Sequence, residues 1–147
     1  MKEVKLIDLK DDVERLLTYI PWLEQKKGTK AGSIYKSDGL EEHSVPFPVY
    51  ETMLLNFVND ASKTKLMDKN YVYAYSRNFI KTVDDERRVI QNAGIKNGDV
   101  LCGIFSKYIL GGMRKGSLWI TGVEEGILLD VLLKMKKLLE IWDAPLA

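Results

Sequence analysis

The last third of the chain contains the pattern that most limits what this sequence can fold into. Between about residue 126 and residue 142, apolar side chains recur every three or four positions. They are Leu128, Leu129, Leu132, Leu133, Met135, Leu138, Leu139 and Trp142. This spacing places them along one wide stripe of an α-helix, and a wide stripe has to be covered by other elements. The sequence therefore predicts a long helix at the centre of a helical core.

Other stretches show the same helical spacing, so we predict further helices around the central one. They are expected at residues 9–23, 50–61, 66–80, 82–93 and 100–109, with a short helix before residue 126. Pro21 should kink the first of them or start a new turn, because its ring removes a backbone donor. Thr82 and Asp85 have the spacing of a capping box at the start of the fourth, and Gly111 with Gly112 should end the fifth.

The segment after residue 28 loses this spacing and carries turn-forming residues instead. Residues 33–36 and 40–45 are predicted to form two short strands around Ser37-Asp38-Gly39, whose aspartate and glycine tolerate turn geometry. Such a ribbon is marginal alone in water, so it would pack on the helices. Pro46 and Pro48 then hold the chain extended and delay the next helix.

The composition is that of one globular domain. The chain has 147 residues, of which 46% are hydrophobic and 29% charged. We therefore expect a single mainly α-helical domain over residues 1–147, built as a compact bundle of about five to seven helices with a small β-hairpin. No membrane contact is expected, because no run of roughly 18 apolar residues occurs. The N-terminus lacks an apolar stretch of signal-peptide length, which favours a cytoplasmic location.

The overall charge does not favour nucleic acid as a partner. Lys and Arg number 22 and Asp and Glu number 21, which leaves a formal net charge of +1. This balance gives no whole-molecule field to attract phosphates, so a nucleic-acid contact would need a local basic patch.

A glycine-flanked basic turn, GGMRKGS at residues 111–117, could hold a small anionic ligand. N–H groups at the start of a helix attract anions, so Arg114 and Lys115, followed by a helix capped by Ser117, could bind a phosphate. Trp119 could stack on a ring of the ligand. The spacing matches neither GxxxxGKS/T nor GxGxxG, and a tight turn with solvated cations accounts for the same residues.

Three tyrosines precede an arginine in the helix predicted at residues 66–80. Tyr71, Val72, Tyr75 and Phe79 have the spacing of a face turned to the core, and Tyr73 could widen that face. The tyrosine rings, with Arg77 after them, could instead stack on bases or on a flat ligand. The candidate binding residues are therefore Arg114, Lys115, Ser117, Trp119, Tyr73 and Arg77.

Catalytic groups are sparse. Glu41 and Glu42 precede His43, the one histidine, but adjacent strand residues point to opposite faces. Only Glu41 and His43 could converge, and a metal ion would still need another ligand. Cys102 lies among apolar residues without a histidine to activate it, so we expect a buried small hydrophobe. We assign no catalytic residue, no metal site and no cofactor.

Four short motifs resemble those of a bacterial protein family of unknown function. They are Tyr19-Ile20-Pro21-Trp22-Leu23, Pro46-Phe47-Pro48-Val49-Tyr50, Gly116-Ser117-Leu118-Trp119 and Glu125-Gly126-Ile127-Leu128, the last running into the leucine-rich C-terminal helix. The resemblance implies an all-helical domain with a small β element and no established activity. An arginine-rich run of that family is replaced here by Ile109-Leu110-Gly111-Gly112-Met113, so a ligand of those arginines would bind differently or not at all.

These observations favour a non-enzymatic binding protein that engages another macromolecule. The partner would be another protein or a second copy of the chain, and an inhibitor or a regulator would be of this kind. The alternative is a small-molecule or nucleotide-binding protein in which Arg114 and Lys115 hold an anionic group. Hydrolysis at Glu41 and His43 is a third hypothesis.

Overall fold

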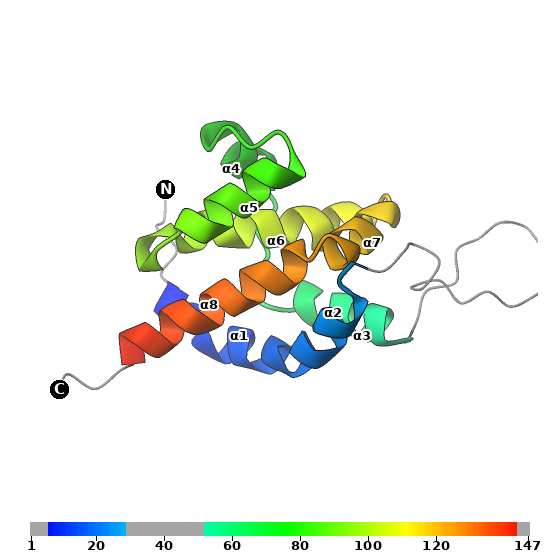
Figure 1. The fold of residues 1–147 in the computed structure, drawn as a ribbon, viewed down its shortest axis with the longest axis horizontal. Coiled ribbons are helices and arrows are strands. Elements are labelled where there is room, and N and C mark those ends of the chain that lie inside the picture. The colour runs from blue at the N-terminus through cyan, green and yellow to red at the C-terminus, as the bar shows by residue number, and fades with distance from the viewer. Residues whose placement is uncertain (1–5, 29–51, 144–147) are drawn as a thin grey trace, which may run out of the picture.

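The structure, a computed structural model, describes residues 6–28 and 52–143. The regular elements in these two stretches are all helices, so the predicted mainly α fold is confirmed. The predicted hairpin, together with Pro46 and Pro48, lies outside the described residues. Figure 1 shows the arrangement of the helices, coloured in chain order.

The N-terminal helical run consists of η1 (Leu6–Leu9), α1 (Lys10–Leu16), η2 (Leu17–Tyr19) and α2 (Ile20–Lys26). Pro21 lies in the first turn of α2, where its missing N–H leaves no hydrogen bond unmade. The predicted new turn at Pro21 is therefore confirmed. Gly28 follows α2 with a φ of 80°, the left-handed conformation that glycine adopts easily.

The second stretch contains α3 (Thr52–Ser62), α4 (Tyr71–Arg77), α5 (Val83–Asn92), η4 (Ile95–Asn97), α6 (Gly98–Gly112), α7 (Ser117–Glu124) and α8 (Ile127–Asp143). α8 contacts α1, α2, α5, α6 and α7, and Figure 1 shows it crossing the middle of the molecule. Leu128, Leu132 and Met135 on α8 are fully buried, whereas Leu133 is 37% exposed. The predicted central helix is confirmed.

α6 is a second central helix, buried on most sides and in contact with α3, α4, α7 and α8. Two of its glycines permit close packing. A Cβ added to Gly103 would lie 2.7 Å from the Cβ of Ala74 on α4. A Cβ on Gly112 would lie 2.1 Å from the Cδ1 atom of Trp119 on α7. Gly112 ends α6 as predicted, and it also makes room for the indole ring.

α5 begins with the predicted capping box. The Thr82 hydroxyl accepts a hydrogen bond from the Asp85 N–H at 3.1 Å, and the Asp85 carboxylate accepts one from the Thr82 N–H at 3.2 Å. These bonds satisfy N–H groups that have no partner inside the helix.

The helix predicted at residues 66–80 is too long, since only Tyr71–Arg77 is helical, as α4. The Asp68 carboxylate accepts a hydrogen bond from the Asn70 N–H at 2.8 Å, and this local turn competes with an earlier helix start. At the other end Phe79 has a φ of 56°, which a right-handed helix cannot contain.

The burial predicted for this segment is also wrong in part. Val72 and Phe79, which were expected to face the core, are 69% and 78% exposed. No side chain of α4 is fully buried. Leu66 and Ile80, which flank the helix, are buried instead. The chain beside α4 therefore enters the core and leaves the helix at the surface.

Candidate functional site

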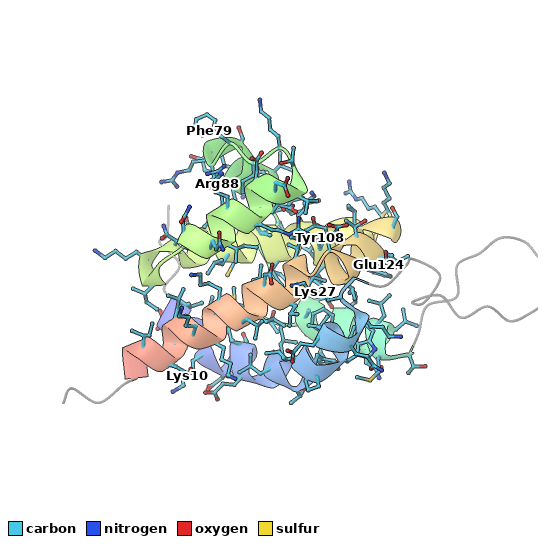
Figure 2. All side chains as sticks on the ribbon, viewed as in Figure 1. Lys10, Lys27, Phe79, Arg88, Tyr108 and Glu124 are labelled. Atoms are coloured by element: carbon cyan, nitrogen blue, oxygen red, sulfur yellow. The ribbon has the colours of Figure 1, made fainter. Side chains whose placement is uncertain are left out.

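Residues 63–81, which we call the α4 corner, expose a cluster of large apolar side chains. Figure 1 shows α4 at the edge of the molecule opposite α1, and α4 packs mainly on α6. Tyr73 is 54% exposed and accompanies the exposed Val72 and Phe79. Figure 2 places Phe79 at the outer edge of the molecule. Clusters of this kind are typical of surfaces that another molecule covers.

The exposure of Phe79 is fixed by its backbone. Its φ of 56° lies in the left-handed region, which costs a bulky residue about 1–3 kcal/mol. The N–H of Phe79 donates to the Ser76 carbonyl at 3.3 Å, and the N–H of Ile80 donates to the Tyr75 carbonyl at 3.0 Å. The turn thus buries Ile80 and directs Phe79 outward.

The α4 corner is more basic than the rest of the molecule. Its charged side chains are Lys63, Lys65, Asp68, Lys69, Arg77 and Lys81. Five cations against one carboxylate give a formal charge of +4, while the whole chain carries +1. Within the described part of the chain, none of these five cations takes part in an ion pair. The corner therefore presents a local positive potential.

A cleft of about 280 Å³ opens between the α4 corner and the first turns of α6. Tyr73 and Arg77 line it from α4, so two of the predicted binding residues meet at one concave site. Asp99 and Cys102 line it from α6, and these were not predicted as binding residues. Asp99 and Cys102 line the cleft because α6 packs against α4, and the spacing of residues along the sequence does not reveal how two helices pack.

The surroundings of Cys102 disfavour nucleophilic chemistry. Burial, with the negative charges of Asp68 and Asp99 adding to it, raises the pKa of the Cys102 thiol to about 12. The thiolate is the reactive form, so the thiol is unreactive near neutral pH. Cys102 is buried, as predicted.

A buried carboxylate ties α4 to the body of the molecule. Glu86 of α5 is 1% exposed and accepts hydrogen bonds from the hydroxyls of Tyr75 and Tyr108, both at 2.5 Å. The Nζ atom of Lys107 lies 3.2 Å from the same carboxylate and 4.9 Å from the centroid of each tyrosine ring. The charge of Glu86 is therefore both paired and hydrogen-bonded, as a buried carboxylate requires.

The cluster around Glu86 holds α4 against α5 and α6. Burial, followed by the hydrogen bond and the charge of Glu86, raises the pKa of Tyr75 and of Tyr108 well above the ordinary value. Both phenols therefore keep their protons and go on donating to the carboxylate. The cluster joins α4, α5 and α6, and Tyr108 lies near the middle of the molecule in Figure 2.

The basic turn predicted to hold an anion lies between α6 and α7. Arg114 and Lys115 are exposed there. The prediction that Ser117 caps this helix is wrong: Ser117 is the first residue of α7, and the preceding glycine occupies the cap position without a side-chain hydrogen bond. The Nε1 atom of Trp119 donates to the Ile109 carbonyl at 3.0 Å, so the half-buried indole takes part in joining α7 to α6.

The predicted binding residues do not form one site. Tyr73 and Arg77 lie beside Asp99 near the start of α6, whereas Arg114 and Lys115 follow its end. α6 rises about 20 Å between these points at ~1.5 Å per residue. The cleft and the basic turn are therefore separate features.

Glu41 and His43, the remaining candidates for chemistry, lie outside the described residues. Within residues 6–28 and 52–143, no group of three or more His, Cys, Asp or Glu side chains is placed to hold a metal ion. No helix in those two stretches has the length and apolar character needed to cross a bilayer.

Comparisons with protein-family models, with curated proteins and with solved structures returned no match. The resemblance to a bacterial family of unknown function stays a prediction. Function is therefore inferred from the α4 corner and its cleft.

Proposed function

We propose that this chain is a protein-binding module whose α4 corner docks onto an acidic, partly apolar surface of another protein. The observation that carries this proposal is the side chain of Phe79, which a strained backbone holds in solvent. Stability alone would favour glycine at a left-handed position. The presence of phenylalanine at this position is explained if a partner protein covers its ring.

The side chains near Phe79 have the composition of an interface centre. Val72 and Tyr73 are exposed on the same corner, and Arg77 lies on the same helix. Aromatic residues and arginine dominate the binding energy of many protein interfaces. We expect Phe79 and Tyr73 to make the apolar contact, with Arg77 donating hydrogen bonds to a carboxylate of the partner.

The positive charge of the α4 corner favours a partner whose surface is negatively charged. A local charge of +4 with no internal ion pair attracts an acidic surface and speeds association with it. Because the cations are exposed, added salt should weaken the complex.

A second copy of the chain fits this surface less well. In a twofold dimer a surface patch meets the same patch on the partner. Lys65, Lys69 and Lys81 would then approach their own counterparts, and like charges in contact are unfavourable. Of the two partners expected from the sequence, the charge pattern favours a different protein over self-association.

Nucleic acid also fits less well than an acidic protein. Cations and aromatic rings occur together in grooves that bind single strands, and the α4 corner has both. Asp68 and Asp99, however, line the cleft beside Tyr73, where they would repel a phosphate backbone. A folded protein can set carboxylates against the cations and keep them away from these aspartates.

Crosslinking tests the proposal. A photoreactive phenylalanine analogue at position 79 should capture a protein in cells, and the captured peptide should be rich in Asp and Glu. The same analogue at position 141 is the matched control, because Ile141 is 62% exposed on α8 and lies outside the α4 corner. It should not capture that protein.

The purified partner then allows a quantitative measurement. Phe79→Ala should raise Kd at least about 30-fold, as expected for a central interface residue whose truncation costs ~2 kcal/mol. Ile141→Ala, which removes an exposed side chain elsewhere, should leave Kd unchanged. Equal Kd values for Phe79→Ala and the unchanged protein would refute the proposal, as would crosslinks from position 79 to nucleic acid or to a second copy.

A further inference from the structure

We propose that the cleft beside α4 binds a small zwitterion with an apolar side chain, of the class of the α-amino acids. The cleft shares Tyr73 and Arg77 with the docking surface, but Phe79 does not line it, and the ligand needs no protein partner. The charges of the cleft, its apolar lining and its size each point to this class of ligand.

The charges match a ligand that carries both signs. Lys65 and Arg77 bring cations to the cleft, and Asp68 and Asp99 bring carboxylates. No ion pair joins these four side chains to one another or to any other described residue. A ligand with a single charge would pair either with the two cations or with the two carboxylates, and it would leave the other two without a counter-charge. A zwitterion satisfies both.

The lining of the cleft suits an aliphatic side chain. Leu66 is fully buried and Cys102 is 3% exposed, with Met67 and Ala74 beside them. An aliphatic group packed here loses contact with water, which favours binding. The volume of about 280 Å³ is just below the range of about 300–1,000 Å³ typical of small-molecule pockets, so an amino acid fits better than a nucleotide.

The chemistry of the side chains assigns the two ends of the ligand. The guanidinium of Arg77 can donate two parallel hydrogen bonds to a carboxylate. The carboxylate of Asp99 accepts hydrogen bonds from an ammonium group. Tyr73 supplies a ring against which the aliphatic part can pack.

Three probes separate the two charges in an NMR titration of the full chain. L-Leucine carries both charges, N-acetyl-leucine carries only the carboxylate, and leucine amide carries only the ammonium. Leucine should shift the amide signals of residues that line the cleft. Each singly charged analogue should bind at least about tenfold more weakly, the equivalent of one lost charge contact.

Variants locate the site. Asp99→Asn and Arg77→Gln should each weaken leucine binding about tenfold or more. Arg15→Gln is the matched control, because it removes an exposed arginine on α1, at the edge of the molecule opposite α4, and it should leave leucine binding unchanged. If leucine shifts no cleft signal, or if N-acetyl-leucine binds equally well, the proposal is overturned.

The two proposals can fail separately. Phe79→Ala should weaken protein docking at least about 30-fold and leave leucine binding unchanged, because Phe79 does not line the cleft. Asp99→Asn should do the reverse, because Asp99 lies on α6 outside the α4 corner. Loss of both activities in either variant would show that the cleft and the docking surface are one site, contrary to the inference.

Discussion

Replacing Phe79 by glycine should make the protein more stable. Glycine adopts the observed φ of 56° without strain, and the 78% exposed ring gives up little buried surface when it is removed. Glycine also loses more backbone entropy on folding, which reduces the gain. We expect the free energy of unfolding, measured by urea denaturation, to rise by about 1 kcal/mol.

Phe79→Ala is the matched control for this prediction. It removes the ring but keeps the Cβ that makes a positive φ unfavourable, so its stability should stay near that of the unchanged protein. If Phe79→Gly proved no more stable than Phe79→Ala, the turn at Phe79 would not be strained.

Glu86 shows why some residues cannot be interpreted from their neighbours in the sequence. It is one of three acids in the first turn of α5, and all three suit the helix dipole. The side chain of Asp84 is 92% exposed, whereas Glu86 is buried against the hydroxyls of Tyr75 and Tyr108. Those partners come from α4 and α6, and no local pattern indicates that the three helices meet there.

At the scale of elements, α4 should depend most on its hydrogen bond to Glu86. Tyr75→Phe removes a hydrogen bond to a charged group, a loss of about 1.5–3 kcal/mol. No side chain of α4 is fully buried and the helix packs mainly on α6, so loss of this bond should favour its local opening. We expect faster amide hydrogen exchange over Tyr71–Arg77, measured by mass spectrometry, and little change in α8.

Tyr108→Phe is the comparison variant. It removes a hydrogen bond to the other oxygen of the same carboxylate, but Tyr108 is 1% exposed within the central helix α6. Exchange should therefore speed up throughout the molecule. The prediction for α4 would be wrong if Tyr75→Phe gave the same global pattern.

Helices whose limits are marked by their own residues could be predicted from the sequence. α5 begins at the Thr82 capping box, and α8 follows an apolar stripe. α4 was misjudged because the turns at Asp68 and Phe79 do not interrupt the apolar spacing. The residues of the cleft were predicted only in part. Tyr73 was predicted because an aromatic side chain can bind a ligand, whereas Asp99 lines the cleft only because α4 packs on α6.

At the scale of the whole molecule, stability should fall in alkaline solution. Burial, with the hydrogen bond to Asp60, raises the pKa of Tyr19 from 10.0 to about 12, and the pKa values of Tyr75 and Tyr108 are raised as well. The unfolded chain therefore releases these protons at a lower pH than the folded chain. The stability that Tyr19 contributes through this shift is complete below pH 10 and is lost as the pH rises through about 12, and the contributions of Tyr75 and Tyr108 are lost at higher pH.

Urea denaturation at a series of pH values measures this loss. In Tyr19→Phe the decline of the free energy of unfolding between pH 10 and pH 12 should be shallower, because one linked proton is gone. A decline of the same slope in Tyr19→Phe would mean that the contact with Asp60 at 2.5 Å does not hold the phenolic proton.

Because no side chain of α4 is fully buried, mutation can reach its outer surface without disturbing the core. Val72, Tyr73 and Phe79 could be exchanged one at a time while Tyr75 and the residues packed beneath the helix keep it in place. The exposed residues that would contact a partner are then largely separate from the residues that stabilise the fold. Under the proposed docking of the α4 corner, a few substitutions at these positions could change the partner that the protein binds, each of them tolerated by the fold on its own.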